Sequence, residues 1–242
     1  MPEPVIHSFP SREECVVADL LAARAAATPD KLFLLFDDER WTYGDAAREA
    51  WRAAHALHRC GVAFGDYVSV WIPTGPDVVR GWFGANAAGA VYAPLNLAAK
   101  GSYLEHTLNL AESKVLLAHH ELVERLDGID APHLETVVVV GGPAPRTLPW
   151  KTVTLDELLD GVPDERPVLP RRVEPWDDLS LKESGENTVS CEAFHFSFRP
   201  QQHAVPQNGK AQVLNVIRNH IITASQRRYG LAAVQQSNAG TG

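Results

Sequence analysis

The chain has 242 residues, of which 45% are apolar and 21% charged, and its formal net charge is −8. The apolar share is that of a globular protein with a sizeable core, and the acidic balance argues against a nucleic-acid or anionic-membrane surface. The N-terminus lacks the cationic start of a signal peptide, and no apolar stretch reaches the length of a membrane span. We therefore expect a cytoplasmic protein without a membrane span.

The three cysteines, Cys15, Cys60 and Cys191, lie far apart, and no C-x-x-C pair is present. This spacing does not fit a metal knuckle, a redox dithiol or a disulfide framework. We expect three thiols without a catalytic role in a reducing compartment.

The first part of the sequence predicts a helix followed by a hairpin. Residues 11–14 (Ser-Arg-Glu-Glu) have the form of a capping box. The alanine-rich helix expected after them should stop before the Thr-Pro pair at 28–29, because proline disfavours helical geometry in its predecessor. Two extended runs, 32–36 and 40–42, flank the polar turn 37–39 and predict a β-hairpin.

A second capping pattern at residues 42–45 predicts an amphipathic helix with its apolar residues from Ala47 to Leu57, ended by Gly61. From residue 67 to residue 140, strand and helix patterns alternate. The strands are expected at 67–72, 90–95, 115–118 and 137–140, and the helices at 77–88, 102–111 and 121–126. This alternation predicts an α/β fold with a mostly parallel sheet flanked by helices.

Individual residues add detail to this α/β pattern. The β-branched run at 137–140 is typical of a strand that is buried on both faces. Thr154 to Glu157 has the form of a cap on a last short helix. The buried face of the helix at 77–88 is expected to consist of Val78, Val79, Trp82 and Phe83.

The sequence changes character after this α/β region. Four prolines among charged residues at 160–178 indicate a linker or a surface-hugging segment. Residues 1–181 contain no glutamine, and their 27 Asp and Glu outnumber their 16 Lys and Arg. Residues 182–242 contain seven glutamines, and their 6 Lys and Arg outnumber their 3 Asp and Glu. The composition therefore breaks between Leu181 and Lys182.

Three segments of the α/β region carry a resemblance to a known family. They are 41–45 (Trp-Thr-Tyr-Gly-Asp), 65–73 (Gly-Asp-Tyr-Val-Ser-Val-Trp-Ile-Pro) and 82–96, which ends in Gly-Ala-Val-Tyr-Ala-Pro-Leu-Asn. Together they resemble the start of the adenylate-forming, or AMP-binding, superfamily. The nearest subfamily is the acyl-CoA ligases of the crotonobetaine/carnitine type. The resemblance covers about residues 15–181.

The resemblance implies a fold and an activity. The expected fold is an incomplete N-terminal subdomain of the adenylate-forming ligase fold. The full-length family activates a carboxylic acid with ATP and Mg²⁺, as in fatty acid metabolism, and then transfers the acyl group to CoA. Three parts are expected: a scaffold subdomain at 1–160, a proline-rich linker at 161–181, and a divergent tail at 182–242.

The family's phosphate loop, rich in Ser, Thr and Gly and followed by Pro-Lys-Gly, should begin shortly after Leu181. Residues 182–190 instead read Lys-Glu-Ser-Gly-Glu-Asn-Thr-Val-Ser, without the preceding apolar strand and without Pro-Lys-Gly. Glu183 and Glu186 would repel phosphates. No catalytic, cofactor-binding or metal-binding residue is therefore predicted, nor any cofactor for this chain. It is expected to be inactive alone, and whether it is an enzyme stays open.

The tail at 182–242 has no counterpart in the late parts of the family. A strand pattern at 194–198 and a helical apolar face at 213–224 describe a poorly ordered or partly helical segment. A frameshift, a gene misprediction and a genuine extension all fit the break, and DNA sequencing across the Leu181/Lys182 junction distinguishes them. The alternative function is a non-catalytic binding or regulatory module. It would pair with a separate chain, or form a homo-oligomer, through an exposed sheet edge.

Four other patterns have a functional and a structural interpretation, and the structural one is favoured in each. Residues 141–143 (Gly-Gly-Pro) should end a buried strand in a turn, since proline prevents the helix of a dinucleotide site. His119 and His120 are expected to point apart on a helix, which does not suit a metal. Residues 37–39 should form a solvated hairpin tip, and 171–172 a solvated arginine pair.

Overall fold

The computed structural model describes residues 15–143, 148–182 and 192–193. The capping box at 11–14, the tail strand at 194–198 and the tail helix at 213–224 lie outside these residues. No helix within the described ranges combines the length and the apolarity needed to cross a bilayer.

The first helix, α1 (Val17–Ala27), ends before the Thr-Pro pair as predicted, but its start differs from the prediction. Its N-cap is Val16, without a side-chain cap hydrogen bond, rather than Ser11. Val16 and Leu21 are each only 4% exposed. Apolar side chains are therefore buried at the start of α1, and the capping box at 11–14 stays a prediction.

The predicted hairpin and the helix after it are both confirmed. Strands β1 (Leu32–Phe36) and β2 (Glu39–Thr42) pair antiparallel. The chain then enters α2 (Tyr43–Arg59) through a capping box. The Thr42 hydroxyl accepts from the Asp45 amide at 3.1 Å, and the Asp45 carboxylate accepts from the Thr42 amide at 2.8 Å. These bonds satisfy amides that a helix start otherwise leaves unpaired.

The predicted parallel sheet is confirmed, with five strands in the order β4-β3-β5-β6-β7. The strands are β3 (Tyr67–Trp71), β4 (Val91–Pro94), β5 (Val115–His119), β6 (Thr136–Val140) and β7 (Lys151–Thr154). The connecting elements are α3 (Pro76–Ala87), α4 (Gly101–Ala111) and the 3-10 helix η2 (Val123–Leu126), and the capped α5 (Leu155–Leu159) follows β7. Strand β7 was not predicted, and the helix expected at 121–126 is the single turn η2.

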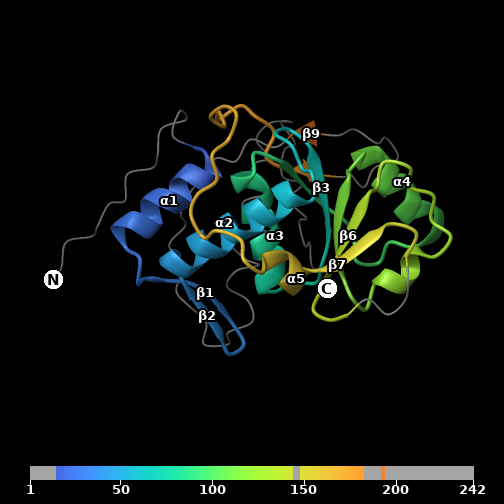
Figure 1. Cartoon of the computed structure of the whole chain (residues 1–242), viewed down its shortest axis with the longest axis horizontal. Coiled ribbons are helices and arrows are strands. Elements are labelled where there is room, and N and C mark those ends of the chain that lie inside the picture. The colour runs from blue at the N-terminus through green and yellow to red at the C-terminus, as the bar shows by residue number, and fades with distance from the viewer. Residues whose placement is uncertain (1–14, 144–147, 183–191, 194–242) are drawn as a thin grey trace, which may run out of the picture. The chain divides into compact units, whose positions relative to one another are not determined.

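The sheet buries both faces, as the β-branched run of β6 predicted. One face packs against α4 and η2, with Trp71, Leu116 and Val137 in its core. The other face packs against α3, where Gly81 lies over Val70 and Leu117. Figure 1 shows α2 and α3 on one side of the sheet and α4 on the other.

Helix α3 packs through small residues rather than through the large ones predicted for its buried face. Val79 is buried as expected, but Val78, Trp82 and Phe83 are half-buried, and Gly81, Gly84 and Ala85 are buried instead. The reason is the close approach of α2. A Cβ placed on Gly84 would lie 2.5 Å from the Cβ of Ala53 on α2.

Residues 159–180 run from α5 along α2 to the outer edge of β4, and we call this segment the strap. In Figure 1 it is the gold-to-orange trace that leaves α5. At its far end the Tyr92 amide donates to the Leu179 carbonyl at 3.2 Å, and Ser180 forms a parallel bridge to Tyr92. The chain continues into β8 (Leu181–Lys182), which pairs antiparallel with β9 (Glu192–Ala193). The strap thus lies at one of the two edges of the five-stranded sheet.

The Gly84 contact gives a stability prediction. Gly84→Ala inserts a methyl group where no space exists, so we expect a loss of about 1–3 kcal/mol of unfolding free energy. Gly81→Ala is the control in the same helix. Its added Cβ would meet Leu117 at an ordinary 3.4 Å, and alanine favours the helix by up to ~1 kcal/mol. Urea denaturation of both variants measures the difference, and equal stabilities would contradict the close helix approach.

Candidate functional site

The topology of the sheet points to one position for a site. From β3 the chain moves to one side to form β4, and then crosses to the other side to form β5. In open α/β sheets, ligands bind outside the carboxyl ends of the strands where the order reverses in this way. The candidate site is therefore the carboxyl end of β3 and β5, with the start of α3 and the end of β6.

The start of α3 places a carboxylate at this position. Gly75 is the N-cap of the helix and Pro76 occupies its first turn, where the missing proline amide costs nothing. Asp77 follows in the same turn. Its negative charge is favoured there by the positive end of the helix dipole.

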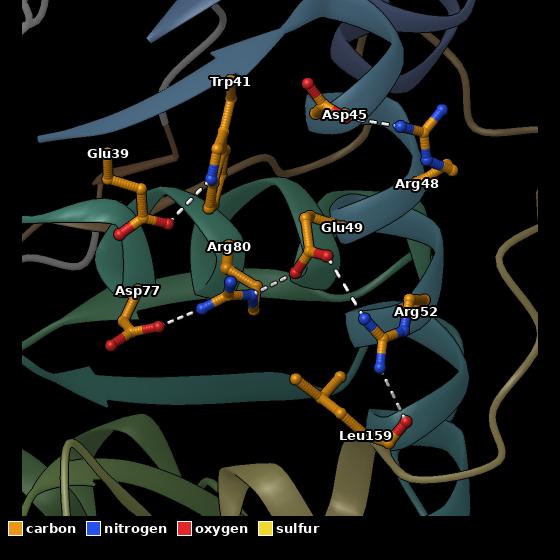
Figure 2. A network of polar contacts seen from close by, with 9 residues as sticks. All are labelled: Glu39, Trp41, Asp45, Arg48, Glu49, Arg52, Asp77, Arg80 and Leu159. Carbon is orange, nitrogen blue, oxygen red and sulfur yellow. Dashed lines mark hydrogen bonds and ion pairs between the residues drawn. The ribbon is translucent and has the colours of Figure 1, made fainter. Parts of the chain in front are cut away.

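Arg80 joins Asp77 to the helix α2 and the hairpin (Figure 2). Its side chain is only 15% exposed, its Nη1 pairs with Asp77, and its Nε lies 2.6 Å from Glu49 on α2. The guanidinium also lies over the Trp41 ring, 5.1 Å from the ring centre. A half-buried cation between two carboxylates and an aromatic face is well satisfied.

The network extends at both ends, as Figure 2 shows. The Trp41 indole donates to Glu39 at 2.8 Å. Arg52 lies 3.3 Å from Glu49 and donates to the Leu159 carbonyl at 3.0 Å. The polar contacts therefore run from the hairpin through α3 and α2 to the start of the strap.

Burial raises the pKa of the Asp77 carboxyl, and the nearby Arg80 opposes this rise. Glu39 and Asp156 raise it further, and His119 lowers it. Groups from the hairpin, α3, β5 and α5 thus act on one carboxyl at the carboxyl end of the sheet. A perturbed carboxyl in such a place is a candidate functional residue, but ion-pair networks that only stabilise a fold have the same effect.

The adjacent histidines were predicted to point apart on a helix, and this prediction is wrong. His119 is the last residue of β5 and His120 follows it, with their ring centres 4.6 Å apart. The rings pack against two glycines at the end of β6. An added Cβ would lie 2.8 Å from His119 at Gly141 and 3.0 Å from His120 at Gly142. Among the residues described, no three His, Cys, Asp or Glu side chains are grouped to hold a metal.

The structure also tests the remaining candidates. The hairpin tip at 37–39 is exposed, as predicted, and β6 ends in a turn at 141–142. The arginine pair at 171–172 is exposed, as predicted, and both side chains also form ion pairs. Arg171 binds Asp177 through two nitrogens at 2.7 and 2.9 Å, and Arg172 lies 3.1 Å from Asp19. Cys60 is buried, which raises the pKa of its thiol and lowers its reactivity.

The charged groups of this arrangement pair with one another. Arg80, the cation at the start of α3, is already held by Asp77 and Glu49. The position expected for a phosphate loop, 182–190, lies outside the described residues except for Lys182. Sequence reasoning named neither Asp77 nor Arg80. The available signal was an Asp and an Arg three residues apart, directly after the Pro of a helix start.

Comparison with known proteins identifies relatives. A family model described as AMP-binding enzyme matches residues 21–181. The medium/long-chain-fatty-acid–CoA ligase FadD6 of Mycobacterium tuberculosis is 38% identical over 100 residues, which are 41% of this chain and 17% of that protein. The acetyl-coenzyme A synthetase of Bacillus subtilis is 36% identical over 108 residues, 44% of this chain and 19% of that protein. The matches therefore span less than a fifth of either relative.

Solved structures show the same fold. The anthranilate CoA ligase AuaEII, in complex with anthranoyl-AMP, superposes with a TM-score of 0.64 at 22% identity, covering 77% of this chain and 34% of that one. The long-chain-fatty-acid–CoA ligase FadD1 from Archaeoglobus fulgidus superposes with a TM-score of 0.61 at 24% identity, covering 74% of this chain and 36% of that one. The predicted fold, an N-terminal subdomain of the adenylate-forming ligase fold, is confirmed for the described residues.

Arg80 yields a second stability prediction. Arg80→Met leaves Asp77 and Glu49 without their shared cation, and we expect a loss of about 2–4 kcal/mol, since one partner of a half-buried ion pair is removed. Arg48→Met is the control. Arg48 is 53% exposed and pairs with Asp45, so its loss should cost less than ~0.5 kcal/mol. Thermal unfolding of the two variants gives the comparison, and a harmless Arg80→Met would exclude a central role for the network.

The raised pKa of Asp77 yields a pH prediction. A carboxyl with a higher pKa in the folded state contributes stability below its ordinary value of 3.8. That contribution is lost as the pH rises through the folded-state value. Wild type should therefore lose stability relative to Asp77→Asn as the pH rises from about 4 toward neutrality.

Asp45→Asn is the control, because its stability relative to wild type should change with pH in the opposite direction. The Thr42 amide and hydroxyl lower the pKa of Asp45 below its ordinary value of 3.8, so wild type should gain stability relative to this variant as the pH rises from the folded-state pKa through 3.8. Urea denaturation at a series of pH values measures both differences. Parallel pH dependences for the two variants would refute the assignment for Asp77.

Proposed function

Because the family model covers residues 21–181, the chain belongs to the AMP-binding enzymes, and from this membership we propose its function. It is the N-terminal part of an ATP-dependent acyl-CoA ligase and does not catalyse that reaction by itself. The proposed parts are the scaffold subdomain at 1–160, the proline-rich segment at 161–181 and the divergent tail at 182–242.

One observation carries this proposal. The family match ends at residue 181, and the composition breaks between Leu181 and Lys182. Two independent properties of the sequence therefore change at the same residue. The residues after it contain no Pro-Lys-Gly, so the sequence motif whose lysine and preceding backbone amides hold nucleotide phosphates in the family is missing from the expected position.

The two relatives described above are named as a medium/long-chain-fatty-acid–CoA ligase and an acetyl-coenzyme A synthetase. A full-length ligase of this kind uses ATP and Mg²⁺ to join AMP to a carboxylic acid, with release of pyrophosphate, and then exchanges AMP for the thiol of CoA. The residues of this chain do not fit ATP. Arg80 is held by two carboxylates, and the stretch of sequence in which the phosphate loop is expected contains Glu183 and Glu186, whose charges would repel phosphates. ATP, Mg²⁺ and CoA are therefore proposed for the full-length family and not for this chain.

The alternative function, a non-catalytic module that pairs with a separate chain, stays a prediction. So do a homo-oligomer and the cytoplasmic location. Of the two sheet edges, the one at β4 is partly occupied by the strap through Leu179 and Ser180. The other edge, β7, is the more accessible place for a partner strand.

The inactivity has a direct test. The purified chain, mixed with ATP, Mg²⁺ and labelled pyrophosphate, should show no carboxylate-dependent exchange of label into ATP with acetate or with medium- and long-chain fatty acids. The Bacillus subtilis acetyl-coenzyme A synthetase, assayed in parallel with acetate, is the positive control. Exchange by this chain above the background without carboxylate would overturn the proposal.

A further inference from the structure

The strap is bound by a basic face of α2 that recognises main-chain carbonyls. Arg52 donates to Leu159 at 3.0 Å, and Arg59 donates to Asp160 and Gly161, both at 2.8 Å. His55 Nε2 lies 3.0 Å from the Glu165 carbonyl, which can only accept, so this nitrogen carries the proton. Three side chains on one helical face thus hold four carbonyls of the strap.

This recognition suits a proline-rich segment. Proline has a carbonyl but no amide hydrogen, and its fixed φ stiffens the chain. A segment with Pro163, Pro167, Pro170 and Pro175 therefore offers acceptors more than donors. The three α2 side chains bind main-chain carbonyls of the strap. Their binding therefore does not depend on which side chains the strap carries at those positions.

The middle of the strap is held by ion pairs and ring contacts. Arg166 and Arg172 both pair with Asp19 on α1, and Arg166 lies 5.6 Å from the centre of the Trp51 ring. Arg171 lies 4.1 Å from the centre of the Phe64 ring. These side chains are largely exposed, so each contact is individually weak. Together they keep the strap in contact with α1 and α2 along its length.

The far end of the strap is held by a buried side chain. Asn86 on α3 is 4% exposed, and its Nδ2 donates to the Leu179 carbonyl at 3.0 Å. The same carbonyl accepts from the Tyr92 amide of β4. Within the described residues the Asn86 Oδ1 has no hydrogen-bond partner. A buried amide with one unsatisfied oxygen costs stability, so its bond to the strap must offset that cost.

We propose that the strap is a closing device with two latches, the α2 basic face at one end and Asn86 at the other. When closed, the strap occupies the outer edge of β4. It thereby places residue 181 beside β4, independently of the sequence that follows. When released, it leaves the outer edge of β4 and the three α2 side chains exposed to solvent. This inference does not depend on the proposed function, because it concerns only contacts within residues 15–181.

The test compares two asparagines of matched chemistry in the full chain. Asn109 on α4 also donates to a main-chain carbonyl, that of Asp130 at 2.8 Å, and its Oδ1 also lacks a partner among the described residues. It lies away from the strap. Asn86→Ala should accelerate hydrogen exchange of the Tyr92 amide about tenfold relative to Asn109→Ala, and trypsin cleavage after Arg171 and Arg172 by a similar factor.

Exchange of the β6 amides separates strap release from unfolding. They should stay slow in Asn86→Ala if the fold is intact. If the β6 amides exchange rapidly, Asn86→Ala has destabilised the whole fold, and the α2 basic face is tested instead. Arg59→Ala should then accelerate cleavage after Glu165 by a glutamate-specific protease about tenfold, relative to the exposed control Arg48→Ala. Equal exchange and cleavage in Asn86→Ala and Asn109→Ala with an intact fold, or equal cleavage in the two arginine variants, would overturn the proposal.

Discussion

The contact between α2 and α3 is the constraint on which the rest of the described fold depends. Gly84 and Ala53 let the two helices approach so closely that a methyl group on Gly84 would lie 2.5 Å from Ala53. Helix α3 lies on the sheet, and α2 reaches the sheet region through α3. The hairpin, α1 and the strap all attach to α2 in turn. A wider separation would displace each of them from the parallel sheet.

The ion-pair network around Arg80 uses this close approach. Glu49 comes from α2 and Asp77 from α3, and a single guanidinium reaches both because the helices are close. A buried ion pair adds little net stability compared with an apolar pair, but it penalises any arrangement that separates its charges. We interpret the network as a determinant of the relative position of α2, α3 and the hairpin. Its place at the carboxyl end of the sheet is then a consequence of where α3 begins.

Most of the fold could be predicted from the sequence, because local signals and the hydrophobic pattern agree there. The capping box at Thr42 and the β-branched run of β6 are such cases. The buried face of α3 could not be predicted, because hydrophobicity favours Trp82 and Phe83 while the packing selects Gly84. Strand β7 has only four residues and lies at a sheet edge. Such a short segment does not show the alternation of apolar and polar residues by which a strand is predicted. Asp77 and Arg80 were missed because their significance depends on Glu49, which lies on another helix.

The strap has a consequence for how this sequence could have changed over time. The matched family region ends at residue 181, next to the point where Leu179 and Ser180 meet β4. The α2 side chains and Asn86 bind only carbonyls of the strap that come before that residue. Loss or replacement of the coding sequence beyond this position would leave every one of these contacts in place. The contacts that hold the strap therefore set no requirement on the sequence that follows residue 181.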